Sequence, residues 1–95
     1  MKVKVKFSAI PELVSLFEGR KDIQLDFPGR TLKDLLDHLI LKVGPKKKGI
    51  FLSDTGEVSP HILVLINGRP IRGLNRVGKM LRENDVVELA LAPAA

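Results

Sequence analysis

Apolar and polar residues alternate along the first segment of the chain and predict a β-strand there. Over residues 2–7 lysines alternate with valine and phenylalanine, which is typical of a strand with one buried and one wet face. A second alternation over residues 22–27 ends at a proline-glycine turn and predicts a strand that pairs with the first. Between them, residues 10–17 have apolar positions at helical spacing and predict a short helical turn.

The longest periodic stretch begins at Thr31 and predicts the main helix of the fold. The Thr31 hydroxyl can cap free backbone amides, and Asp34, three residues later, reinforces this end as in a capping box. The apolar residues that follow at spacings of three and four are Leu32, Leu35, Leu36, Leu39, Ile40 and Val43. Gly44 and Pro45 end the pattern, so we expect roughly twelve helical residues, enough to cross one face of a small sheet.

The second half of the chain begins with an irregular segment and continues with a hairpin. Residues 44–60 predict a loop, in which Phe51 and Leu52 anchor the segment to the core rather than form an exposed docking spot. Residues 62–66 are continuously apolar, which fits a strand covered on both faces, or one with a covered face and an interface. The following Asn-Gly dipeptide favours a tight turn, and a proline then places the return strand, residues 69–71, at a sheet edge.

A final apolar segment, residues 86–91, predicts the last strand, whereas residues 92–95 have no pattern that requires burial. The order of elements is then β-β-α-β-β-β. This order predicts an α+β fold, with one main helix packed across a mixed sheet. We expect a single domain over residues 1–91 and a flexible C-terminal tail over residues 92–95.

The composition excludes several classes of chemistry. The chain has 95 residues with no cysteine, tryptophan or tyrosine, and only two histidines. Disulfides, thiolate nucleophiles and the commonest zinc sites all need a sulfur atom that is missing here. His38 and His61 have no ligand partner at a suitable spacing, and we interpret both as structural residues. The sequence therefore predicts no enzyme, no metal site and no cofactor.

The pattern of the chain also bears on its location. No apolar stretch is long enough to cross a bilayer. Met1 leads directly into the first predicted strand, without the apolar region of a signal peptide. The expected compartment is the cytoplasm.

The charge balance points to an acidic partner. The formal net charge is +5, from 16 lysines and arginines against 11 aspartates and glutamates, which suits an acidic protein surface or a nucleic acid. Nucleic acid is the weaker hypothesis, because the four phenylalanines occupy core-like positions. The lysine run 46–48 is interpreted as a solvated loop. Arg69, Arg72 and Arg76 cluster around the predicted hairpin, either as a basic rim for docking or as scattered solubilising charge.

Three motifs together resemble a known family over nearly the whole chain. They are TLKDLLDHL at residues 31–39, VLINGR at residues 64–69 and LRENDVVEL at residues 81–89. With the element order, they are similar to the helix opening, the Asn-Gly turn and the approach to the tail in the MoaD/ThiS family of sulfur carriers. The long 44–60 connection looks most like that of the molybdopterin synthase small subunit within this family.

The resemblance implies a ubiquitin-like β-grasp fold and a role in molybdopterin biosynthesis. An E1-like adenylyltransferase would activate the C-terminal carboxylate for conversion to a thiocarboxylate, and a larger synthase subunit would receive the tail. The tail residues implied are Ala92, Pro93, Ala94 and Ala95. The partner-docking residues implied are Ile66, Asn67, Gly68, Arg69 and Arg72.

The last two residues depart from the family pattern, in which sulfur carriers end in Gly-Gly. Here they are Ala94 and Ala95, and each adds a methyl group that restricts the backbone in a narrow tunnel. Either a natural Gly-Gly lies just beyond the printed chain, or the protein lacks sulfur transfer. In the second case it is a ubiquitin-like interaction module that binds partners through its sheet face.

Overall fold

The computed structural model describes residues 1–71 and 76–92. Of the residues predicted to bind partners, Arg72, Pro93, Ala94 and Ala95 lie outside the described residues. The strands are β1 (Lys2–Ser8), β2 (Asp22–Asp26), β3 (Ile62–Ile66), β4 (Arg69–Pro70) and β5 (Val86–Leu91). The α-helices are α1 (Pro11–Leu16), α2 (Leu32–Val43) and α3 (Lys48–Phe51), and the 3₁₀ helices are η1 (Pro45–Lys47) and η2 (Arg76–Gly78).

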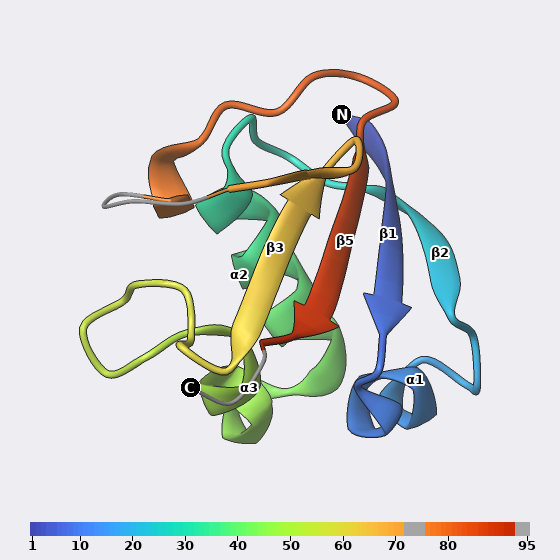
Figure 1. Ribbon diagram of the computed structural model, residues 1–95, viewed down its shortest axis with the longest axis vertical. Helices are drawn as coiled ribbons and strands as arrows, with labels where there is room; N and C mark the ends of the chain where they lie inside the picture. Colours follow the sequence, from blue (N-terminus) through green and yellow to red (C-terminus); the bar gives the residue numbers. More distant parts are fainter. Residues whose placement is uncertain (72–75, 93–95) are drawn as a thin grey trace.

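The five strands form one mixed sheet in the order β2-β1-β5-β3-β4 (Figure 1). The first and last strands, β1 and β5, are parallel neighbours at its centre, and Val5 lies opposite Val87. The other pairs, β1 with β2, β5 with β3 and β3 with β4, are antiparallel. The sequence predicts the pairing of β1 with β2 correctly, although α1 and a turn separate the two strands.

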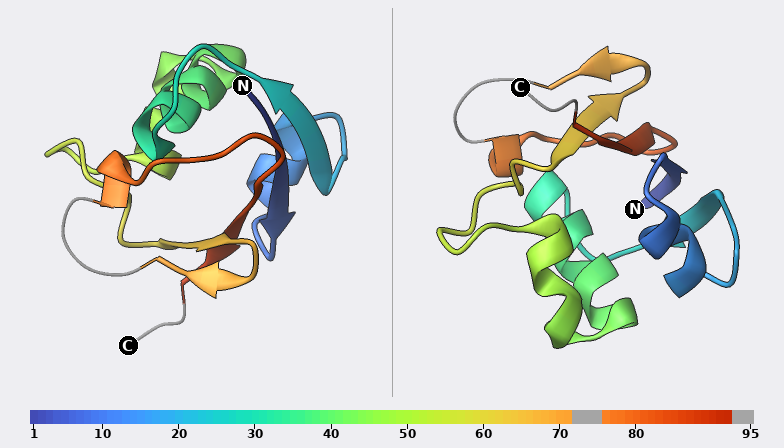
Figure 2. Two further views of the ribbon diagram at one scale, coloured as in Figure 1. Left: turned by 90° about the horizontal axis from the view of Figure 1, so that it is seen from above. Right: turned by 60° about the horizontal axis from the view of Figure 1, so that its bottom comes forward.

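The core lies between the sheet and α2, which crosses one face of it (Figure 2). The residues of β1, β5 and β3 that point toward α2 are buried: Val3, Val5, Phe7, Val87, Leu89, Ile62, Val64 and Ile66. From the helix, Leu32, Leu35, Leu36 and Leu39 complete this layer, each at most 1% exposed. We call this side of the sheet the inner face and the opposite side the outer face. The pattern predicted every one of these helix positions.

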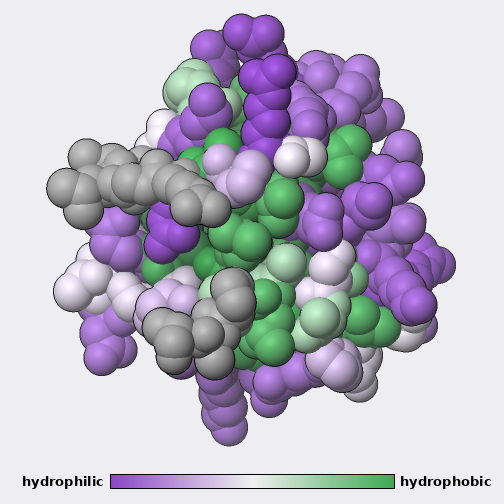
Figure 3. All heavy atoms as spheres, in the orientation of Figure 1, coloured by the Kyte–Doolittle hydropathy of each residue, from purple (hydrophilic) through white to green (hydrophobic). Residues whose placement is uncertain are grey.

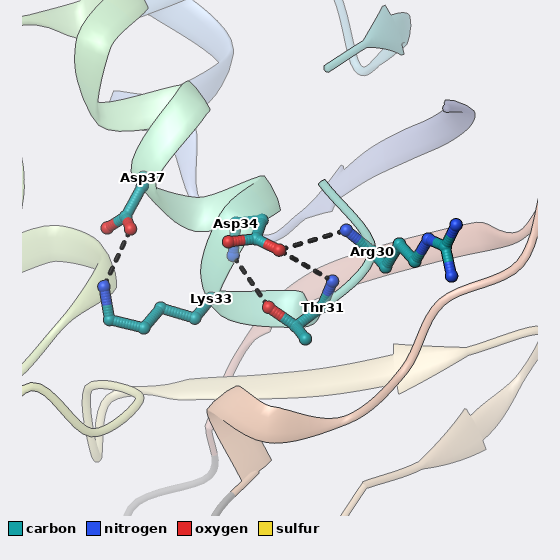
Figure 4. Close-up of polar contacts among 5 residues, drawn as sticks. All are labelled: Arg30, Thr31, Lys33, Asp34 and Asp37. Atoms are coloured by element: carbon teal, nitrogen blue, oxygen red, sulfur yellow. Dashed lines mark hydrogen bonds and ion pairs between the residues drawn. The ribbon is translucent and has the colours of Figure 1, made fainter. Parts of the chain in front are cut away.

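A capping box at Thr31 starts α2 (Figure 4). The Asp34 backbone N–H donates to Thr31 Oγ1 at 3.2 Å, and Asp34 Oδ2 accepts from the backbone N–H groups of Thr31 at 3.1 Å and Arg30 at 3.0 Å. The Arg30 N–H and then the Thr31 groups lower the pKa of the Asp34 carboxyl below its ordinary value of 3.8. The predicted cap is confirmed, and the helix has the expected 12 residues.

The connection after α2 is more regular than predicted. It contains η1 and the single turn α3, where the sequence predicts an irregular loop. The helical turns were not predicted because this lysine-rich segment has too few apolar residues to show a helical period. The predicted anchor is confirmed: Phe51 is 0% and Leu52 4% exposed.

These layers confirm an α+β fold of the β-grasp type, a mixed sheet of five strands with one main helix. Among the described helices, none has both the length and the apolar character needed to span a membrane. What the fold leaves open to partners is the outer face and the end of β5.

Candidate docking face and tail exit

The end of β5 is where the predicted tail leaves the domain. Leu91 pairs with Ile62 and is 57% exposed. The Ala92 N–H still donates to the His61 carbonyl at 2.9 Å, so the strand ladder holds the chain up to residue 92. On the other side, Ala90 lies opposite Ser8 of β1. The tail therefore starts from the middle of the sheet, with a strand on either side of its base.

The outer face has an apolar half that covers β5 and β3. Leu63 and Leu65 of β3, with Val86 and Ala90 of β5, point away from α2 and are half-buried. Leu63 lies opposite Ala90, so the two strands present these side chains side by side. Figure 3 shows hydrophobic atoms gathered over these strands. We call Leu63, Leu65, Val86 and Ala90 the apolar stripe.

The remaining part of the outer face is charged. Lys2, Lys4 and Lys6 alternate with the buried residues of β1, and Lys6 lies between Asp22 of β2 and Glu88 of β5. Ser8 Oγ donates to Glu88 Oε2 at 2.6 Å. An incoming surface that covers the apolar stripe thus meets a row of lysines along one side, which fixes its orientation by charge.

The hairpin at the opposite end of β5 is built around Asn67. Asn67 Nδ2 donates to Asp85 Oδ1 at 2.9 Å, and Asn67 Oδ1 accepts from the Val86 N–H at 2.9 Å. The turn needs positive φ at Asn67 (53°) and Gly68 (83°), as the Asn-Gly signal predicts. These bonds join the β3–β4 turn to the start of β5, and Asn67 is thereby a bracing residue of the hairpin.

The predicted docking residues separate into two groups. Gly68 and Arg69 are exposed with Asn67 at the hairpin. Ile66 belongs to the inner face and is 7% exposed, and its neighbour Leu65 is the side chain that reaches the outer face. The sequence missed Leu63 and Leu65 because an unbroken apolar run hides which residues face the helix. Counting alternate positions from the Asn-Gly turn is the signal that finds them.

A cavity lies beside the tail exit. This cavity, of about 840 Å³, is lined by residues of the β1–α1 connection and α1, among them Phe7, Ile10 and Val14. The Phe7 ring is buried and stacks on Phe17 at 5.0 Å between centroids. Because Ser8 lies opposite Ala90, this cavity opens at the same end of the sheet as the tail.

The described ranges contain no candidate metal centre. Residues 1–71 and 76–92 contain no group of three or more histidine or acidic side chains placed to hold a metal ion. The pKa of Lys33 is raised, chiefly by its hydrogen bond to Asp37 at 2.8 Å, which is a solvent-exposed pair on α2. His38 packs near the Phe27 ring, with centroids 6.4 Å apart, which fits its structural interpretation.

Comparison with known proteins supplies the family. The Urm1 (Ubiquitin related modifier) family matches residues 2–91. No curated protein matches the sequence. The solution structure of Urm1 from Trypanosoma brucei is similar, with a TM-score of 0.74, 26% identity, and coverage of 99% of this chain and 94% of that chain. Small archaeal modifier protein 1 of H. volcanii gives a TM-score of 0.72 and 26% identity over 97% of this chain and 98% of its own.

A third structure shares the fold alone. It is a putative molybdopterin converting factor, subunit 1, from Pyrococcus furiosus, with a TM-score of 0.67 and 22% identity over 98% of this chain and 99% of that chain. The expected ubiquitin-like carrier fold and the absence of an enzymatic role are confirmed. The assignment to the molybdopterin synthase small subunit stays a prediction. The chain belongs to the Urm1 (ubiquitin related modifier) family, a group of small, non-catalytic β-grasp sulfur carriers and modifiers.

Proposed function

We propose that this protein carries sulfur on its C-terminal carboxylate, after activation by an E1-like adenylyltransferase. The observation that carries the proposal is the family match over residues 2–91 in a domain whose central strand β5 leads directly into the tail. A central strand is held on both sides, so the base of the tail has a fixed position relative to the outer face. A partner that docks on that face can then guide the tail into its own active site.

The proposed chemistry needs no catalytic group from this chain. The terminal carboxylate attacks the α-phosphorus of ATP, and pyrophosphate leaves, which forms an acyl adenylate. A sulfur nucleophile from a donor then attacks the acyl carbon and releases AMP. If the nucleophile is hydrosulfide, loss of its proton leaves the thiocarboxylate directly. If it is a protein persulfide, the acyl disulfide that forms is reduced by a second thiol, which breaks the S–S bond, releases the thiocarboxylate and leaves the donor as a disulfide. The activating enzyme supplies the electrostatic stabilisation of each step, and the carrier supplies the docked, correctly placed carboxylate.

Docking is assigned in this proposal to the apolar stripe, with the lysines of β1 along one edge. The exposed hairpin residues Asn67, Gly68 and Arg69 border it at the other end of the face, and Arg72 extends the proposal beyond the described residues. Glu88 of β5 lies opposite Leu65, between Val86 and Ala90, so the face combines apolar side chains with charged ones, as protein interfaces commonly do. Because activation consumes ATP, the proposed location is the cytoplasm.

A role in molybdopterin biosynthesis is the finer proposal. The resemblance of the sequence motifs supports it, and it makes a larger synthase subunit the second partner. The alternative is a ubiquitin-like interaction module without sulfur transfer, which the apolar stripe supports equally well, since it needs only a docking face. The tail residues Ala94 and Ala95 bear on this choice. Each adds a methyl group that hinders insertion of the tail into an enzyme tunnel, which a carrier requires and an interaction module does not.

The test is adenylation by the E1-like enzyme of the same organism, measured as carrier-dependent exchange between ATP and pyrophosphate. Addition of a sulfur donor should then give the mass increase of one oxygen-to-sulfur exchange in the intact protein. Two matched variants separate the outcomes: one ends at Leu91, and one carries Gly-Gly in place of Ala94-Ala95. If only the Gly-Gly variant supports ATP–pyrophosphate exchange, the interaction module is favoured for the natural chain. If neither the wild-type protein nor the Gly-Gly variant supports this exchange, the carrier function is contradicted.

A further inference from the structure

A cavity of about 460 Å³ lies between the β3–β4 hairpin and the segment that leads into β5. Its lining consists of Ile66, Asn67, Arg69, Ile71, Lys79, Arg82 and Asp85. It sits at the start of β5, whereas the tail leaves from the other end of that strand. The cavity is therefore separate from the tail exit and from the cavity beside α1.

The charge of this cavity is positive. Arg69, Lys79 and Arg82 are all exposed, and among the described residues none of them makes an ion pair. Asp85 is the one acidic residue among the described residues of the lining, and both of its carboxylate oxygens already accept hydrogen bonds. Its Oδ1 accepts from Asn67 Nδ2 and its Oδ2 from the Arg82 backbone N–H, each at 2.9 Å. The three cationic groups thus outnumber the single Asp85 carboxylate, whose oxygens are held by Asn67 and by the Arg82 backbone, and the described lining keeps a net positive charge.

The backbone around the cavity is held in place before any ligand arrives. The Asn67 side chain joins the hairpin to Asp85 and Val86, as described above. On the opposite wall, the Lys79 carbonyl accepts from the Leu32 N–H at 2.9 Å, and the Leu81 N–H donates to the Arg30 carbonyl at 2.6 Å. Both walls are thus tied to the first turn of α2 or to β5, so binding costs little ordering of the backbone.

From this arrangement we infer that the cavity binds an acidic side chain of a protein partner. Guanidinium and ammonium groups bind carboxylates by charge-assisted hydrogen bonds. Ile66 and Ile71 add apolar surface that suits the aliphatic part of a glutamate or a neighbouring apolar residue. The described part of the lining includes no aromatic ring, whereas binders of single-stranded nucleic acid stack bases on such rings. The cations also converge on one cavity rather than follow a backbone track.

The cavity and the apolar stripe lie on different sides of the hairpin, because Arg69 pairs with Ile66 of the inner face. Leu65 of the stripe lies opposite Pro70, next to Arg69, and Val86 follows Asp85 directly. The acidic contact at the cavity therefore does not require that the same partner segment cover the stripe. This inference does not depend on sulfur transfer, since the same contact serves a carrier or an interaction module.

The test is an NMR titration of the ¹⁵N-labelled protein with a blocked hexapeptide of alternating glutamate and leucine. We expect saturating shifts at Arg69, Lys79 and Arg82, with a Kd on the order of 1 mM that rises steeply with salt. In the double variant Arg69→Glu, Arg82→Glu, the Kd should rise at least about tenfold, because two attractive charges become repulsive. The Arg82 backbone N–H remains, so the bond to Asp85 and the fold are retained.

Matched controls isolate the charge at the cavity from the net charge. The double variant Lys46→Glu, Lys48→Glu makes the same charge change on exposed residues far along the chain, and its Kd should be unchanged. Equal shifts with a glutamine-leucine peptide, or equal weakening in both double variants, overturn the inference. So does tighter binding of a single-stranded oligonucleotide at the same residues. Failure of ATP exchange leaves these results unaffected, which keeps the two proposals distinguishable.

Discussion

The two faces of the sheet both carry aliphatic side chains but use them differently. On the inner face, every position of β1, β5 and β3 within the core is apolar and covered by α2. On the outer face, apolar residues occur only over β5 and β3, and lysines cover β1. We expect burial against α2 to set the stability of this domain, and the outer face is left for the docking that we propose.

The largest expected difference between the faces comes from leucine-to-alanine changes. Leu89 on the inner face is fully buried, and Leu89→Ala should lower the free energy of unfolding by about 3 kcal/mol, from lost burial and the cavity left behind. Leu65→Ala on the outer face should lower it by about 1 kcal/mol or less, because the side chain is already in contact with water. Urea unfolding measures both. Equal losses would contradict the division of roles.

A change at Gly29 should loosen α2 without touching the outer face. Gly29 has φ +149°, and a Cβ atom there would lie 2.5 Å from Asp34 Cβ. Gly29→Ala therefore displaces the capping carboxylate of Asp34. We expect the free energy of unfolding, measured by thermal or urea unfolding, to fall by about 2 kcal/mol. The control is Gly49→Ala in α3, where an added Cβ has no heavy atom within 4 Å and should be neutral or slightly stabilising.

The Asp34 carboxylate makes the stability of the fold depend on pH. Because the pKa of Asp34 is lowered in the fold, its ionised form stabilises the native state. This contribution is fully present above the ordinary pKa of 3.8 and is lost as pH falls through the lower value in the folded protein. Asp34→Ala should cost about 1 kcal/mol at neutral pH, and the difference from wild type should shrink in acid.

Urea unfolding in a pH series measures this effect, and Asp37→Ala is the matched control. Asp37 is also an acidic residue of α2, but it only pairs with Lys33 in solvent, so its removal should change stability by about 0.5 kcal/mol or less. A constant difference between wild type and Asp34→Ala across the acid range would show that the carboxylate charge is not what caps the helix.

The smallest expected effect lies within the outer face itself. Glu88→Ala removes the 2.6 Å bond from Ser8 and the acidic neighbour of Lys6. We expect the free energy of unfolding to fall by about 1 kcal/mol or less. Any partner contact that Glu88 makes should also depend less on salt. A loss as large as that of Leu89→Ala would mean that the outer face also determines stability.

Much of the fold follows from local pattern in the sequence. Thr31 with Asp34 marked the start of α2, and Asn67-Gly68 marked the hairpin, because in both cases one short motif fixes the backbone. The central position of β5 beside β1 has no local signal, since the two strands are more than 70 residues apart in the chain. It entered only through the resemblance of the motifs to a known family.

The candidate site was predicted less completely than the fold. The hairpin residues were found because Asn-Gly and arginine are conspicuous in sequence. Lys79, Arg82 and Asp85 were missed because they approach Arg69 only after β3 and β5 pair, and pairing across a sheet is not readable from spacing. Ile66 was included with the docking residues because its burial depends on which side of β3 faces α2.

The parallel pairing of β1 with β5 also has a consequence for biosynthesis. Of the described strands, β5 is synthesised last and lies between β1 and β3, so the β2-β1 and β3-β4 pairs are not joined into one sheet until it is made. Contacts between the two ends of a chain delay folding until synthesis is almost complete. A folded domain of this protein is thus one in which β5 has already been synthesised, so a partner that recognises the folded sheet does not bind chains that still lack this strand.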